Sequence, residues 1–141
     1  MKVTLDTNVL VRLATQDDPA QAALALRVLQ KASLIAVPTP ALCELVWVLL
    51  RGYRYTPAQV AHALRTLLQV QQVVCHTPTV LAGLALLENG GDFADGVIAF
   101  EGDLLGGTEF VSFDQQAIKL LKAQKRKVRL LAPGNEKPPT R

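Results

Sequence analysis

The chain has 141 residues and a mass of 15.2 kDa, which fits one ordinary domain. Half of the residues are hydrophobic and 19% are charged, which excludes disorder of the whole chain. The longest apolar run, residues 45–50, is too short to span a bilayer, and the acid at position 6 interrupts the N-terminus before a signal-like stretch can form. We therefore expect a soluble, cytoplasmic protein that does not enter a membrane.

The net charge of +3 conceals an uneven distribution of charged residues. Residues 119–141 carry eight Lys or Arg and one acid, a net charge of +7, whereas residues 1–118 carry seven Lys or Arg and eleven acids, a net charge of −4. Residues 88–118 alone contain seven acids and no Lys or Arg. A basic C-terminal segment on an acidic body predicts a polyanionic partner.

Short β-branched and aliphatic runs alternate with longer segments of helical periodicity. In chain order, the predicted elements are a strand at 3–5, helices at 9–14 and 19–32, a strand at 34–37, a helix at 39–51, a helix from 56, a strand at 73–75, helices at 77–87 and 92–105, a strand at 109–113, a helix at 114–123 and a strand at 128–131. This alternation predicts an α/β domain over residues 1–132 with a central, mostly parallel sheet. Residues 133–141, with three prolines and no apolar pattern, are predicted to be a disordered tail.

Four of the predicted helices begin with a polar residue followed by proline. The four pairs are Asp18-Pro19, Thr39-Pro40, Thr56-Pro57 and Thr77-Pro78. The polar side chain can accept a hydrogen bond from a free backbone N–H, and proline suits the first helical position because its φ angle is already helical.

Two acids end predicted strands. Asp6 follows the first strand and Asp114 follows the fourth, so both belong to the carboxyl edge of the sheet, where parallel α/β folds bind ligands. Each acid could equally cap the helix that follows it. The sequence leaves both roles open.

Two further candidate acids lie on predicted helices. Glu44 sits in a helix that is apolar on every face, which predicts burial, and a buried carboxylate must be protonated, paired or bound to a metal. Asp95 shares a helix start with Asp92. Asp92 suits the helix cap and is left out of the site, whereas Asp95 lies beside the core face.

If these four acids converge, their mutual repulsion requires a cation. Carboxylate ligands without Cys or His favour a hard ion, Mg²⁺ or Mn²⁺. The two histidines, His62 and His76, share no ligand spacing and are expected to be surface or packing residues. Cys43 and Cys75 are expected to be buried thiols.

These motifs together resemble the PIN-domain ribonucleases, and within them the VapC-type toxins of bacterial toxin–antitoxin pairs. The matching segments are Asp6-Thr7-Asn8, Glu44, Asp95 followed by Val97-Ile98-Ala99, and Ser112-Phe113-Asp114. The resemblance covers about residues 1–132 and implies a three-layer α/β/α domain.

The resemblance also implies an activity and partners. Asp6, Asp95 and Asp114 would hold the metal, and Glu44 would orient or deprotonate the water that attacks an RNA phosphodiester, which leaves a 5′-phosphate and a 3′-hydroxyl. A VapB-like antitoxin and a homodimer are the implied protein partners.

The basic C-terminal segment is the candidate RNA contact. The residues predicted to hold the RNA backbone are Lys122, Lys125, Arg126 and Lys127, with Lys119 and Arg129 beside them. A solvated helix end is the competing interpretation of these charges.

Two other classes of protein stay open. Receiver-like and dehalogenase-like phosphoryl-transfer domains also use a strand-end Asp, but Asn8 stands where the dehalogenase-like pattern needs a second acid. A degenerate PIN domain that binds RNA or a partner without cleaving is the other alternative.

Overall fold

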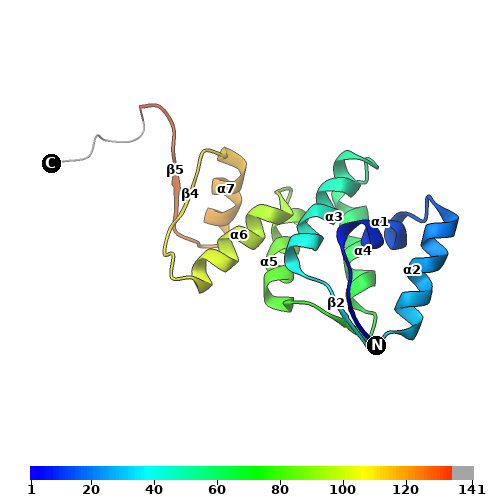
Figure 1. The fold of residues 1–141 in the computed structure, drawn as a ribbon. Coiled ribbons are helices and arrows are strands. Elements are labelled where there is room, and N and C mark those ends of the chain that lie inside the picture. Colours follow the sequence, from blue (N-terminus) through cyan, green and yellow to red (C-terminus); the bar gives the residue numbers. More distant parts are fainter. Residues whose placement is uncertain (135–141) are drawn as a thin grey trace. The chain divides into compact units, whose positions relative to one another are not determined.

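A computed structural model describes residues 1–134 (Figure 1). The chain divides into two compact units, residues 1–80 and residues 81–141, and the boundary falls within one helix. Most of the predicted tail, residues 135–141, lies outside the described part of the chain.

The first unit alternates strands and helices around a three-stranded parallel sheet. Its elements are β1 (Lys2–Thr4), α1 (Thr7–Thr15), α2 (Pro19–Lys31), β2 (Leu34–Ala36), α3 (Thr39–Arg51), α4 (Pro57–Leu68), β3 (Val73–Val74) and the first turn of α5 (Thr77–Glu88). The sheet order is β1-β2-β3, with Ile35 of β2 paired to Val3 on one side and Val73 on the other. All three carboxyl ends therefore meet at one edge.

The core of the first unit is aliphatic. Ile35 in the central strand is fully buried, and α1 and α3 contribute Leu10, Leu42 and Leu49, each with an exposed fraction of 1% or less. Helix α1 contacts both α2 and α3. These contacts also restrain the short connection from β1 to α1, which carries Asp6.

The second unit holds the remainder of α5, α6 (Phe93–Leu104), β4 (Phe110–Ser112), α7 (Gln115–Ala123) and β5 (Val128–Leu130). Strands β4 and β5 pair in parallel, with Val111 opposite Arg129. One core cluster joins the helices to the strands: Leu86, Ala99 and Leu121, with Phe110, Leu120 and Val128 packed against them.

Helices α5 and α6 approach each other closely through two glycines. A Cβ atom at Gly96 would lie 2.5 Å from the carbonyl oxygen of Ala82, and one at Gly83 would lie 2.6 Å from the buried ring of Phe93. No side chain fits at either position without a shift, so Gly96 fixes the place of the neighbouring Asp95 on α6.

Two of the four polar-proline helix starts are confirmed as caps, whereas Thr39 and Thr77 are already the first residues of their helices. Asp18 accepts a hydrogen bond from the N–H of Gln21 ahead of Pro19, and Thr56 forms a reciprocal capping box with Gln59. The prediction that Thr39 caps its helix is wrong. Thr39 is already helical, and Pro38, which offers no side-chain acceptor, takes the cap position.

The α/β class with parallel strands is confirmed; four strands are one or two residues shorter than predicted, and β1 keeps three residues but begins one residue earlier. The strands form two sheets within residues 1–134, one in each unit. None of the helices in this range is long and apolar enough to cross a membrane.

Candidate active site

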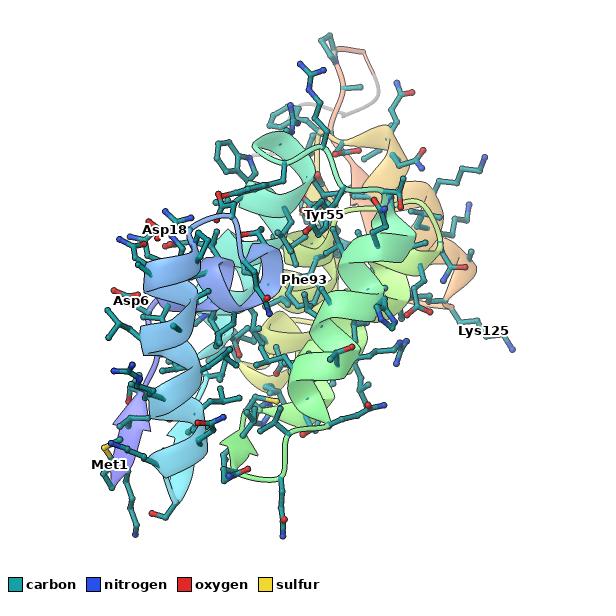
Figure 2. The ribbon with its side chains drawn as sticks, turned by 90° about the vertical axis from the view of Figure 1, so that its right-hand side faces the viewer. Met1, Asp6, Asp18, Tyr55, Phe93 and Lys125 are labelled. Atoms are coloured by element: carbon teal, nitrogen blue, oxygen red, sulfur yellow. The ribbon has the colours of Figure 1, made fainter. Side chains whose placement is uncertain are left out.

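Asp6 stands at the carboxyl end of β1, directly after the buried Leu5 (Figure 2). Its Oδ1 atom accepts a hydrogen bond from the backbone N–H of Val9 at 3.1 Å, so the predicted helix-capping role is confirmed. The side chain is exposed, and its Oδ2 atom accepts no hydrogen bond within residues 1–134. Capping thus leaves one carboxylate oxygen of Asp6 for a ligand.

Glu44 is linked to the residue that follows Asp6. The Thr7 hydroxyl, at the first position of α1, donates a hydrogen bond of 2.7 Å to Oε2 of Glu44 in the middle of α3. The same bond leaves Oε1 unrestrained. Within the first unit, the structure therefore brings Glu44 to the carboxyl end of β1, where Asp6 lies.

The prediction that Glu44 is buried is wrong. Leu42, Leu45 and Leu49 point from α3 into the core, while Glu44 and Trp47 lie on the exposed face. The apolar composition of the helix misled the sequence interpretation because the exposed face also carries a large apolar residue, the indole of Trp47, which is 64% exposed.

A hydrogen-bonded clasp holds α1 against the residues after α3. The Arg12 guanidinium contacts Asp17 at 2.9 Å, and the Tyr53 hydroxyl donates to Asp17 Oδ2 at 2.6 Å. The hydrogen bond from Tyr53 is the largest cause of a lowered pKa at Asp17, and the same hydroxyl raises the pKa of Arg12. The clasp restrains the two helices that Thr7 and Glu44 connect.

In the second unit, the starts of α6 and α7 lie side by side. The side-chain amide of Gln116 donates a hydrogen bond of 3.1 Å to the carbonyl of Gly90, in the turn before α6. Asp92 caps α6 through the N–H of Ala94 at 3.0 Å, and Asp114 caps α7 through the N–H of Ala117 at 3.1 Å. Both N-termini therefore present carboxylates to the same region, where helix dipoles favour negative charge.

Asp95, in the first turn of α6, is close enough to both capping acids for their charges to act on it. Burial is the largest cause of its raised pKa, and the negative charges of Asp92 and Asp114 raise it further. Its carboxylate has no ion pair in the described part of the chain. In the second unit, the negative charges of Asp92 and Asp114 thus both act on Asp95, and a cation near Asp95 would offset them.

Asp92 is the residue that sequence reasoning left out. Its capping role is confirmed, but its charge also acts on Asp95. The signal was present in the spacing, because residues three apart in a helical turn face each other.

No group of three or more His, Cys, Asp or Glu within residues 1–134 is placed so as to hold a metal ion. The donors at both strand edges are nevertheless carboxylate oxygens, the ligand type that suits Mg²⁺ and Mn²⁺. The chemistry of the donors fits these ions.

A model of the PIN domain family matches residues 3–129. The chain belongs to the PIN domain family. PIN domains are in general nucleases that act on nucleic acid, typically with divalent metals, so the predicted fold family and the broad nuclease class are confirmed. No curated protein matches the chain.

The basic segment of this PIN domain is partly neutralised. The Arg126 guanidinium pairs with Asp103 and donates to the carbonyl of Ala99 at 3.4 Å, and Arg129 pairs with Glu109 at 2.7 Å. By contrast, the three predicted lysine contacts, Lys122, Lys125 and Lys127, are exposed and form no ion pair among the described residues. Figure 2 shows the side chain of Lys125 extending away from the ribbon.

We interpret the histidines and cysteines of the PIN domain as packing residues. His76 pairs through Nδ1 with the hydroxyl of the buried Thr79, and His62 lines an apolar cavity. Cys43 and Cys75 form no disulfide, as predicted, but both are half-buried, so the prediction that they are buried is wrong.

Proposed function

We propose that this PIN domain is an Mg²⁺- or Mn²⁺-dependent endoribonuclease of the VapC type. One observation carries the proposal: Asp6, Glu44, Asp92, Asp95 and Asp114 form no ion pair within residues 1–134. Elsewhere in the same range, Asp17, Asp103 and Glu109 each pair with an arginine, while Asp18 and Glu101 form no ion pair. Asp6 and Asp114 directly follow parallel strands, where such folds bind ligands, and a divalent cation would supply the positive charge that these acids lack.

In this proposal, each acid keeps the role that the resemblance to PIN nucleases implies. Asp6, Asp95 and Asp114 hold the metal, which when bound lowers the pKa of water and stabilises negative charge on the phosphodiester. Glu44, fixed through Oε2 by Thr7, uses Oε1 to orient the attacking water and accept its proton. Asp92 stays with the cap of α6 and contributes negative charge.

A cleavage assay with matched cap variants tests the activity. We expect RNA cleavage with Mn²⁺ that EDTA abolishes and that Asp6→Asn lowers by orders of magnitude. Asp18→Asn is the control, because Asp18 caps α2 at the same 3.1 Å distance but lies outside the proposed site. Equal cleavage by the two variants would contradict the proposal.

We also propose that a VapB-like antitoxin binds the apolar cavity of the first unit. This cavity of about 640 Å³ is open on one side and lies among α1, α2, α3 and α4, with Leu10, Leu26, Leu29, Leu45 and Leu67 in its wall. Its shape and lining suit the apolar face of a partner helix. Copurification with the product of a neighbouring reading frame, abolished in Ala63→Glu, is the expected result.

A homodimer is the third partner in the proposal. Sedimentation of the purified chain alone and with RNA measures it directly. A monomer at all concentrations would remove the homodimer while leaving the nuclease and antitoxin proposals intact.

A PIN domain that binds RNA without cleaving it is the second candidate function. The observation in its favour is that no three ligands in the described range lie close enough to hold a metal. RNA binding without cleavage by wild-type protein in Mg²⁺ and in Mn²⁺ would select this function.

A further inference from the structure

The exposed face of α3 carries an acid, an aromatic ring and a cation at helical spacing. Glu44 precedes Trp47 by three residues and Arg51 by seven, so the three follow one another along the same face. All three are exposed, and Trp47 is the only tryptophan of the chain. Exposure of a large ring to water is unfavourable, and such rings mark contact surfaces.

The charge beyond Glu44 is entirely positive. Residues 45–87 contain three arginines and no Asp or Glu. Arg51 at the end of α3 and Arg54 just after it are exposed, and neither forms an ion pair in the part of the chain that the structure describes. Along α3 and the residues just after it, the proposed catalytic acid is therefore followed by an indole and then by two exposed arginines.

We propose that Trp47 stacks on a base of single-stranded RNA beside the bond to be cleaved, while Arg51 and Arg54 hold the adjoining backbone phosphates. The inference rests on the proposed ribonuclease function and deepens it by naming the residues on and after α3 that bind the substrate. Trp47 lies about one helical turn (~5 Å) from Glu44 along α3, so a base on the indole belongs to a nucleotide close to the attacked phosphate. Only an unpaired base offers its face to a side chain in this way.

A second copy of the chain is a poorer fit to this face. A stable protein interface takes about 800 Å² from each partner, with a core from which charged residues are depleted. Here the indole stands between a carboxylate and a guanidinium, and the carboxylate is already fixed by Thr7. One ring between two charges suits a base and its phosphates better than an apolar protein surface.

The single tryptophan allows a direct test in EDTA, where the proposed cleavage is absent. Its fluorescence is titrated with oligoadenylate, with the same oligoadenylate annealed to oligouridylate, and with inorganic polyphosphate. We expect saturable quenching by the single strand and little by the duplex or by polyphosphate, which has charge but no bases. Binding of labelled oligoadenylate should weaken by about five- to a hundredfold in Trp47→Ala and change much less in Trp47→Phe.

Two controls separate stacking from other effects. Leu24→Ala removes a similarly exposed apolar side chain from α2 and should leave RNA affinity unchanged. Arg51→Gln and Arg54→Gln together should lower the log–log salt slope of binding by about 0.7 for each phosphate that the arginines no longer hold.

Several outcomes would overturn the inference. Equal quenching by polyphosphate, or unchanged affinity in Trp47→Ala, would remove the stacking role. An emission maximum that depends on protein concentration without RNA, together with a change in sedimentation for Trp47→Ala, would assign the face to a second copy. If the wild type stacks RNA but cleaves none with Mn²⁺, the nuclease proposal fails and the stacking result stands.

Discussion

The Thr7 hydroxyl and the Glu44 carboxylate, 37 positions apart in the chain, are joined by a hydrogen bond of 2.7 Å. This bond connects the start of α1, next to the strand-end Asp6, to the centre of α3. It restrains one oxygen of the proposed proton acceptor and leaves the other available. The position of the Glu44 carboxylate thus depends on Thr7, a residue that carries no charge.

Loss of this hydrogen bond should reduce turnover more than substrate binding. Hydrogen bonds to charged groups contribute about 1.5–3 kcal/mol, so Thr7→Val should lower kcat by roughly tenfold or more, with a small change in KM. Thr7→Ser keeps the hydroxyl and should restore most of the rate. Steady-state kinetics on a single-stranded RNA measure both constants, and equal losses in Thr7→Ser and Thr7→Val would assign Thr7 a packing role.

Neutralising Asp95 should stabilise the metal-free protein. Its raised pKa means that the folded state disfavours the charged form, so Asp95→Asn should raise stability at neutral pH by less than about 1 kcal/mol, since the group is only half-buried. Removal of an acid from the first turn of α6 costs a few tenths of 1 kcal/mol in the opposite direction. Thermal melts in EDTA measure the balance.

The pH dependence of stability tests independently whether Asp95→Asn stabilises the metal-free protein. A carboxyl whose pKa is raised on folding destabilises the native state at neutral pH, and this penalty disappears as the pH falls through the raised pKa. The advantage of Asp95→Asn should therefore vanish in acid. Mn²⁺ should stabilise the wild type by mass action and the variant less. A lower EDTA midpoint for the variant, with an unaltered Mn²⁺ increment, would reduce Asp95 to a helix-start residue.

The lysines of the basic segment should contribute to RNA binding separately from Arg126. Replacing Lys122, Lys125 and Lys127 together with Gln should lower the log–log salt slope by about 0.7 for each phosphate that a lysine had neutralised. Arg126→Gln breaks the pair with Asp103, so it should lower the melting temperature slightly and leave the slope nearly unchanged. A triple-lysine variant with the wild-type slope would show that this surface is merely solvated.

The Tyr53 clasp should make stability sensitive to acid. Asp17 has a lowered pKa, so its stabilising contribution is present above its ordinary pKa and is lost as the pH falls through the lowered value. Tyr53→Phe removes the largest cause of that shift and should lower the melting temperature at neutral pH. The difference from the wild type should shrink in strong acid, and a difference that stays constant with pH would contradict the ionic role.

Local features of the sequence determined the order of helices and strands. Asp18 and Thr56 cap their helices, and Asp6 and Asp114 follow strands and cap the next helix, because a cap involves only residues two or three positions away. Thr39 and Thr77 are the exceptions among the four polar-proline starts, since each is already the first residue of its helix.

The strand-end acids could also be found from the sequence alone. Alternation of strands and helices predicts parallel strands, and parallel strands end at one edge, so the order of the elements is enough to assign Asp6 and Asp114 to such edges. The family assignment over residues 3–129 agrees with that order of motifs.

Only the tertiary structure decided which faces and charges are available. Glu44 was expected in the core, but the packing of α1 against α3 buries Leu42 and Leu49 and leaves Glu44 and Trp47 in solvent. Asp103 neutralises Arg126 from 23 positions away. Such contacts follow from how helices pack and not from local propensity, so a single sequence specifies the acids of this PIN domain but not which residues surround them.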